Sequence, residues 1–136
     1  MPRPDLIIRG RRVVLPGAIA PRSVHIREER IVFVGDYDDV VVGGEIVEAG
    51  DESVVMPGLV DTHVHINAPG RTEWEGFRSA TLAAAAGGVT TLVDMPLNSI
   101  PPTTTLAGFK TKLETARGDC FVDVGFWGGV VPVNTA

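Results

Sequence analysis

The sequence predicts an α/β fold whose character changes at residue 57. Residues 1–57 contain short apolar and β-branched runs separated by glycines and charged turns, which is typical of a small, mostly antiparallel β-layer. After residue 57, apolar runs alternate with segments of helical periodicity. That order produces parallel strands joined by right-handed crossovers. We therefore expect two domains, 1–57 and 58–136.

The composition is that of a globular protein. The chain has 136 residues, of which 44% are hydrophobic and 21% are charged, and its net charge is −5. The negative charge and the absence of a basic stripe argue against nucleic acid as a partner. No long apolar run suggests a signal peptide or a membrane span. The single cysteine, Cys120, fits a reducing compartment and is expected to be a small apolar residue at a strand start. A cytoplasmic protein that binds neither nucleic acid nor membrane is the resulting expectation.

In the first region, glycines and charged turns divide the β-layer into short strands. The acidic stretch from Asp36 to Asp39, together with Gly43 and Gly44, is expected to be a solvated loop. His25 lies on an alternating strand with nothing nearby to complete a metal site, so we expect a surface or packed histidine. The predicted strands cover residues 6–9, 12–15, 23–27, 31–34, 45–48 and 53–56.

In the second region, the first strand is expected at 59–65 and the next at 89–95. The segment 72–75 has the spacing of a capping box, which predicts a helix start there. Helical spacing and a Gly-Gly stop complete this helix. Its expected apolar positions are Trp74, Phe77 and Thr81, and its expected stop is Gly87-Gly88.

A second helix is predicted before a third strand. Its apolar positions are expected to face the sheet, its charged positions are expected to face water, and Gly118 should end it. The third strand is expected at 120–126, running on to Val131. The apolar positions are Leu106, Phe109 and Leu113, and the charged positions are Lys110, Lys112 and Glu114.

The second region is too short for a complete β/α barrel. It holds two strand–helix units and one further strand, whereas such a barrel needs eight units and about 250 residues. Three parallel strands with two helices would leave open edges and an uncovered face. We therefore expect the incomplete N-terminal part of a (β/α)8 TIM-type barrel, preceded by the small β-layer. An independently stable small α/β domain is the alternative.

His63 and His65 lie two residues apart at the end of the first predicted strand. Side chains on a strand repeat every second residue, so both imidazoles are expected on one side. Two neutral imidazoles are half of a metal site, and a barrel's chemistry lies at the C-terminal ends of its strands. A pair of core or surface histidines is the alternative. Asp61 is in phase with both and could either orient one ring or accept backbone hydrogen bonds.

The sequence around this pair, VMPGLVDTHVH at 55–65, resembles the first-strand signature of the amidohydrolase superfamily. The segments PGRTEWEGF at 69–77 and DMPLNSIPPT at 94–103 resemble those of its cyclic amidohydrolases, and together they are most similar to the allantoinases. The likeness covers essentially the whole chain, and it implies that the β-layer at 1–57 is the N-terminal part of a composite β-sandwich. A bare His-x-His arises often by chance, whereas this combination of three motifs is specific.

The resemblance implies metal-dependent hydrolysis of a cyclic amide. A divalent metal pair, with zinc ahead of cobalt, manganese or iron, lowers the pKa of bound water to about 7 and polarises the carbonyl. His63 and His65 match the two histidines that bind one metal. A bridging carboxylated lysine, two later histidines and an aspartate are implied outside this chain. No catalytic residue is therefore assigned in residues 1–136, and the chain alone is expected to be inactive. The full-length protein is expected to be a homo-oligomer, a tetramer.

The residue two positions after the second histidine indicates the class of substrate. Dihydroorotases carry an arginine two residues after the second histidine, where it grips the substrate carboxylate, but this chain has Asn67. A neutral amide suits an uncharged cyclic ureide such as allantoin, which would be opened to allantoate in purine catabolism. Asn98 is a second candidate contact, although it could equally shape a proline-rich turn. A dihydropyrimidinase or hydantoinase, a dihydroorotase-type enzyme and a non-catalytic relative remain alternatives.

Two further residues near this site are expected to be structural. Arg71 could reach the substrate, but a capping or salt-bridging role near the following helix is favoured. Trp74 is expected in the core rather than as a substrate platform.

Overall fold

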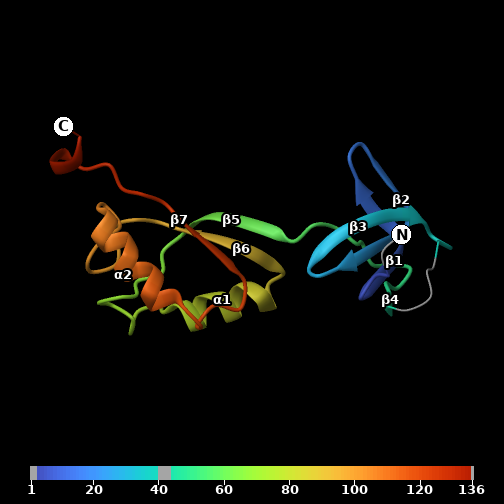
Figure 1. Cartoon of the computed structure of the whole chain (residues 1–136), viewed down its shortest axis with the longest axis horizontal. Helices are drawn as coiled ribbons and strands as arrows, with labels where there is room; N and C mark the ends of the chain where they lie inside the picture. Colours follow the sequence, from blue (N-terminus) through green and yellow to red (C-terminus); the bar gives the residue numbers. More distant parts are fainter. Residues whose placement is uncertain (1–2, 40–43, 136) are drawn as a thin grey trace. The chain divides into compact units, whose positions relative to one another are not determined.

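The computed structural model describes residues 3–39 and 44–135, which divide into two compact units at the boundary between Pro57 and Gly58 (Figure 1). The first unit is a four-stranded sheet in the order β3-β2-β1-β4. The pairs β1–β2 and β2–β3 are antiparallel and β1–β4 is parallel, which confirms a mostly antiparallel layer. The strands are β1 (Leu6–Leu15), β2 (Ala18–Arg27), β3 (Arg30–Asp36) and β4 (Glu45–Glu48).

Two strand predictions in this unit were wrong. The runs 6–9 and 12–15 form one strand, β1. The pairing of β1 with β2 shifts in register between Gly10 and Val13, but the strand continues through this irregularity. The run 53–56 forms only an isolated bridge, from Val55 to Val13. Gly43, which was predicted to lie in the acidic loop, is outside the described residues.

The second unit is a parallel three-stranded sheet in the order β5-β6-β7 with two crossover helices, which confirms the α/β prediction. In Figure 1 α1 lies below the strands and α2 lies to the left, beside their ends. The elements are β5 (Leu59–Val64), α1 (Phe77–Ala86), β6 (Val89–Asp94), α2 (Leu106–Ala116), β7 (Asp123–Phe126) and a short 3-10 helix (Pro132–Asn134).

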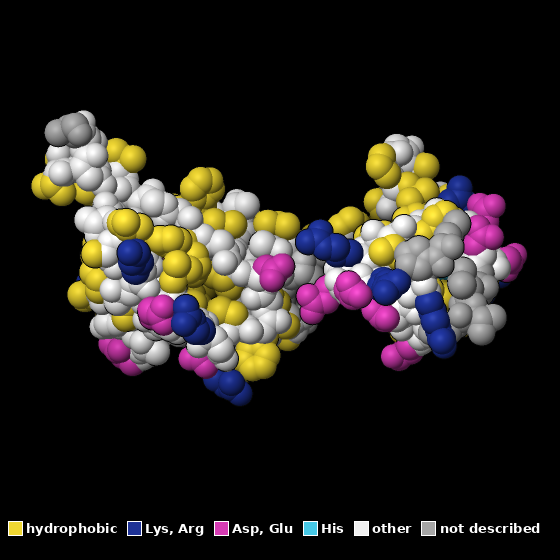
Figure 2. Space-filling model, in the orientation of Figure 1, with side chains coloured by type: hydrophobic (Ala, Val, Ile, Leu, Met, Phe, Trp, Pro, Cys, Tyr) yellow, Lys and Arg dark blue, Asp and Glu magenta, His cyan; other side chains and the backbone are white. Residues whose placement is uncertain are grey.

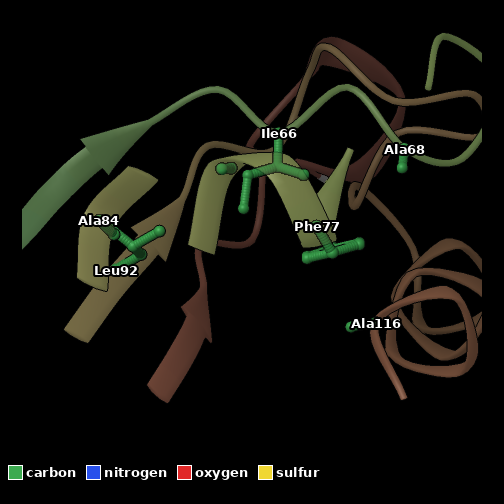
Figure 3. Close-up of a cluster of buried hydrophobic side chains, with 7 residues drawn as sticks. Ile66, Ala68, Phe77, Ala84, Leu92 and Ala116 are labelled. Atoms are coloured by element: carbon green, nitrogen blue, oxygen red, sulfur yellow. The ribbon is translucent and has the colours of Figure 1, made fainter. Parts of the chain in front are cut away.

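The core of this unit gathers side chains from α1, α2, β6 and the segment that follows β5 (Figure 3). Ile66 is fully buried although it lies beyond the end of β5. Alanines on both helices allow close approach to the sheet. The buried members of the cluster are Ile66, Ala68, Phe77, Ala80, Ala84, Leu92 and Ala116.

Helix α1 begins later than the sequence predicts. Residues 72–74 form a turn, and the helix starts at Phe77 after the extended residue Gly76. The backbone N–H of Gly76 donates to the Ser79 hydroxyl at 3.2 Å, so Ser79 closes the first turn. The capping box predicted at 72–75 was therefore wrong, because the carbonyl of Glu75 is already engaged by Asn67 in the preceding loop. The predicted stop is confirmed: Gly87 caps the helix and Gly88 has a φ of +77°.

Helix α2 buries a different face from the one the sequence predicts. Its buried positions are Gly108, Lys112 and Ala116, spaced every four residues. Leu106 and Leu113, predicted to face the sheet, are exposed. The prediction that Lys112 faces water was wrong, because this lysine is fully buried where Asp94 supplies a counter-charge.

Strand β7 is shorter than predicted at both ends. It begins at Asp123 rather than Cys120 and stops at Phe126 rather than continuing to Val131. Beyond Phe126, the backbone forms hydrogen bonds with Thr103, in the loop before α2. The carbonyl of Trp127 accepts from the Thr103 hydroxyl at 2.9 Å, and Gly129 N–H donates to the Thr103 carbonyl at 3.0 Å.

Gly108 provides a test of the packing of α2. A Cβ at this position would collide with the Pro102 carbonyl. We expect Gly108→Ala to lower the free energy of unfolding by about 1–3 kcal/mol through overpacking, although alanine favours helices. Thermal unfolding measures the effect, with Gly128→Ala as the control because a Cβ there meets nothing within 4 Å. Equal melting temperatures for the two variants would contradict the close approach.

The second unit exposes many large apolar side chains (Figure 2). On β5, Leu59 is 51% and Val60 is 58% exposed, and beyond β7 Val130 is 82% exposed. Exposed apolar area on this scale commonly marks a surface that binds another protein surface, a membrane or a ligand. Within the described residues, no helix is long and apolar enough to cross a membrane.

Candidate functional site

The two predicted metal ligands lie next to each other at the C-terminal end of β5. His63 is within the strand and His65 follows it directly, and both side chains are exposed. Their ring centroids are 5.2 Å apart, with an angle of 65° between the ring planes. Strand alternation thus places both imidazoles on one side of the strand, as the sequence predicts.

The spacing of these rings suits one shared metal ion. A tetrahedral zinc with Zn–N bonds of about 2.0–2.1 Å holds the centroids of two imidazole ligands roughly 5 Å apart. The separation of His63 and His65 agrees with that value. Among residues 3–39 and 44–135, however, no group of three or more His, Cys, Asp or Glu side chains could hold a metal. The described residues therefore fit two ligands of a metal site.

Asp61 binds the backbone beside this pair. Its Oδ1 accepts a hydrogen bond from the backbone N–H of His63 at 3.0 Å. Of the two roles open from the sequence, the structure thus shows the backbone one, which stabilises the end of β5.

A buried ion pair binds Ile66, the residue directly after His65, and sequence reasoning missed it. Lys112 Nζ is 2.6 Å from Asp94 Oδ2, and both side chains are almost completely buried. Asp94 Oδ1 accepts the N–H of Ile66, and Lys112 Nζ donates to the carbonyl of Ile66, each at 2.6 Å. Burial raises the pKa of the Asp94 carboxyl above its ordinary value, against the opposing effects of Lys112 and the Ile66 N–H.

One signal in the sequence could have revealed this pair. Lys112 lies four residues from both Gly108 and Ala116, so it shares a helix face with two small residues. Asp94 ends a strand of buried character. A lysine within a stripe of small residues, opposite a strand-terminal carboxylate, is a candidate for burial in an ion pair.

The two predicted substrate-binding asparagines contact each other. Asn98 Nδ2 donates to Asn67 Oδ1 at 3.2 Å, which joins the loop after β6 to the loop after β5. Asn67 is buried and Asn98 is half-buried. The backbone of Asn67 is bound on both sides, by the Glu75 carbonyl at 2.9 Å and the Arg71 N–H at 3.2 Å. Asn67 is therefore held firmly two residues after His65.

Arg71 and Trp74 differ from their predicted roles. Arg71 Nη1 donates to the Asn98 carbonyl at 3.2 Å, and its guanidinium lies 5.0 Å from the Trp74 ring centroid. Arg71 thus bridges two loops instead of capping α1. Trp74 is 65% exposed, so its predicted core position was wrong. The cause is local, because residues 72–74 form a turn that points the indole away from the core.

Trp127 is a further residue near the site that the sequence did not indicate. Its indole Nε1 donates to the Thr62 carbonyl at 3.0 Å, and its backbone N–H donates to the Asp94 carbonyl at 2.9 Å. The segment after β7 therefore reaches across the end of β6 to β5.

The remaining histidine and the cysteine have structural positions. His25 is buried, with Nε2 2.8 Å from the Asp39 carbonyl and its ring 5.3 Å from that of Phe33, which confirms a packed histidine. Cys120 is exposed, precedes β7, and has its Sγ 3.4 Å from the Ala116 carbonyl. Partial burial and the neighbouring Asp119 raise the pKa of this thiol, which disfavours a reactive thiolate.

Comparison with protein families matches residues 54–136 to the amidohydrolase family. An allantoinase of Streptomyces avermitilis is 52% identical over 131 residues, covering 96% of this chain and 29% of that protein. A mitochondrial allantoinase of Aquarana catesbeiana is 51% identical over 129 residues, covering 94% and 26%. Among solved structures, the L-hydantoinase of Arthrobacter aurescens has a TM-score of 0.82 at 34% identity, covering 94% of this chain and 28% of that one. The chain spans less than a third of the length of these relatives.

Proposed function

The chain belongs to the amidohydrolase family, and on that basis we propose that it is the N-terminal part of an enzyme that opens the ring of allantoin to give allantoate. One observation carries the proposal: the exposed imidazoles of His63 and His65 lie 5.2 Å apart at the end of β5, and Asn67, two residues further on, is hydrogen-bonded to Asn98. The relatives named allantoinase, at about half identity over nearly the whole chain, support this substrate.

We also propose the fold of the full-length protein that surrounds the site. Residues 58–136 would form the first strand–helix units of a (β/α)8 barrel, and residues 1–57 would form part of a composite β-sandwich. The parallel order β5-β6-β7 and the exposed apolar side chains of β5 support the barrel, because a closing barrel would cover them. Assembly of the full-length protein as a tetramer and its cytoplasmic location stay predictions.

In the proposed site, His63 and His65 bind a divalent ion, with zinc as the leading candidate. A metal pair supplies an activated water and a polarised carbonyl at neutral pH. A carboxylated lysine and the other ligands would come from the rest of the enzyme. The contribution of this chain is binding and placement: His63 is held by the strand and by Asp61, and His65 by the buried segment that follows it.

Asn67 and Asn98 are proposed to bind the substrate ring. Their side chains are joined by one hydrogen bond, from Asn98 Nδ2 to Asn67 Oδ1, which uses only part of the donor and acceptor capacity of the two carboxamides; a ureide would bind through the remainder. Both are neutral, so they offer no counter-charge to a substrate carboxylate. This favours allantoin over dihydroorotate.

A substrate panel tests the function. The full-length protein, prepared with zinc, cobalt or manganese, is expected to hydrolyse allantoin and to leave dihydroorotate unchanged. Turnover of hydantoin or dihydropyrimidines without turnover of allantoin would move the assignment to a hydantoinase, the activity named for the L-hydantoinase that this chain resembles in structure. A protein that binds metal and hydrolyses none of these rings would support the non-catalytic alternative.

Asn67 provides a test of the substrate contact. We expect Asn67→Ala in the full-length enzyme to raise the KM for allantoin about tenfold, with a smaller change in kcat, since one lost hydrogen bond is worth about 1 kcal/mol or somewhat more. Steady-state kinetics measure the effect, and Asn134→Ala, at an exposed asparagine beyond β7, is the control. An unchanged KM would remove Asn67 from the substrate site.

A further inference from the structure

We propose that the buried Asp94–Lys112 pair is a positioning device that binds both backbone polar groups of Ile66 and so sets the places of His65 and Asn67 on either side of it. This inference rests on the proposed function, because it assigns the pair to the placement of one proposed metal ligand and one proposed substrate contact. Neither Asp94 nor Lys112 is proposed to touch metal or substrate.

The contacts form a closed triangle. Asp94 Oδ1 accepts the Ile66 N–H at 2.6 Å, Lys112 Nζ donates to the Ile66 carbonyl at 2.6 Å, and the two charged groups are 2.6 Å apart. These residues come from the end of β6, from α2 and from the segment after β5. Three separate elements are therefore joined at one residue.

Ile66 needs this arrangement because it is buried outside regular structure. It lies two residues beyond the end of β5, so its N–H and carbonyl lack partners in the strand ladder, and its side chain is directed into the core (Figure 3). Unpaired backbone groups in a dry interior are costly. The ion pair supplies both partners in place of a neighbouring strand.

An ion pair is an unusual choice for this core. Lys112 is fully buried, with Nζ 5.4 Å from the Phe77 ring centroid. Removing two charges from water is costly, and well-packed apolar residues often give equal stability. Two charged groups that bind the N–H and the carbonyl of one residue, however, define the position and orientation of its backbone more closely than apolar packing does. Stability alone therefore does not explain the pair, whereas placement does.

The position of Ile66 in the chain links it to the proposed site. His65 is its neighbour on one side and Asn67 its neighbour on the other, and the two bound groups lie in the peptide groups that join Ile66 to each of them, so a shift of the Ile66 backbone moves both side chains. Reacting groups tolerate little movement, since a displacement of about 1 Å can cost a factor of about 100 in rate. The pair thus couples the metal side of the proposed site to its substrate side.

The test uses two double variants of the full-length protein. Asp94→Leu/Lys112→Met removes both charges together, so no unpaired charge is left in the core, and it frees both backbone groups of Ile66. Asp94→Asn/Lys112→Met is also neutral but keeps an oxygen that can accept the Ile66 N–H. Zinc affinity is measured by competition with a chelator, alongside the melting temperature and the KM for allantoin. The control is Thr81→Val, which removes a buried hydroxyl on α1 that donates to the Phe77 carbonyl at 2.6 Å, accepts the Phe121 N–H at 3.2 Å and makes no hydrogen bond to Ile66.

We expect the leucine–methionine variant to bind zinc at least about tenfold more weakly than the parent and to raise the KM. The asparagine–methionine variant should recover part of both losses, and Thr81→Val should lower the melting temperature without changing zinc affinity. Parental zinc affinity and KM in both double variants would overturn the inference while leaving the proposed function intact. Equal losses in both double variants, or a matching loss in Thr81→Val, would also overturn it, because the effect would then be one of general stability. A parent that binds no divalent ion would overturn the proposed function, and this inference with it.

Discussion

Replacing His63 and His65 together with alanine is expected to abolish one metal site of the full-length protein and to lower kcat/KM for allantoin by about three orders of magnitude or more. The two rings are 5.2 Å apart at the end of β5 and are exposed, so each can offer a nitrogen to the same ion. Loss of Lewis-acid activation removes several kcal/mol of transition-state stabilisation, and each 1.36 kcal/mol is a factor of ten in rate.

Metal analysis and steady-state kinetics on the same preparations measure this effect. His25→Gln is the matched control, because His25 is packed against Phe33 and the Asp39 carbonyl in the other unit. It should lower stability and leave the metal content unchanged. Equal metal content in the parent and the double alanine variant would show that these histidines are not ligands, and would favour a non-catalytic relative.

The second large effect is expected from Lys112→Met alone. The variant leaves the Asp94 carboxyl buried without its cation, and removal of one partner of a buried pair costs about 3–5 kcal/mol. Chemical unfolding should therefore show a much lower free energy of unfolding. The matched control is Lys110→Met, since Lys110 lies on the same helix but is exposed, and its replacement should change stability by about 0.5 kcal/mol or less. Equal stability of the two variants would contradict the burial of Lys112.

The pH dependence of this loss has a defined sign. Burial already raises the pKa of Asp94, and loss of Lys112 should raise it further in the folded state. Between the unfolded and folded pKa values, the folded protein then binds more protons than the unfolded chain, so stability falls as pH rises. The difference between Lys112→Met and the parent should therefore be smallest at low pH, where Asp94 is protonated in both states, and should grow as the pH increases. A loss that grows toward low pH would show that Asp94 does not cause it.

Much of the architecture follows from the sequence because local patterns carry it. The parallel unit is predicted by the spacing of its apolar runs, and the end of α1 by Gly87-Gly88, where Gly88 has a positive φ. Strand alternation predicts that His63 and His65 share one side. In each case the decisive interaction lies within a few residues of the chain.

The start of α1 shows where local patterns fail. The capping-box spacing at 72–75 is present, yet the helix begins at Phe77. The backbone of Asn67 binds the Glu75 carbonyl, and Arg71 turns toward Asn98. Contacts with another loop thus outweigh a local signal that is worth about 1 kcal/mol.

The sequence by itself determined the α/β class, through strand periodicity and the Gly-Gly stop, and it indicated the family through three motifs that resemble those of amidohydrolases. All of these signals lie within short stretches of neighbouring residues. Only the tertiary structure decided which polar groups are buried together. From the sequence, Lys112 is expected to face water, but in the fold it is buried against Asp94 and the Ile66 carbonyl. The sequence likewise gives no partner for the Asn67 side chain, whereas in the fold it accepts a hydrogen bond from Asn98. The physical reason is that a buried charge or amide is stable only with its partner, and these partners lie far away in the chain.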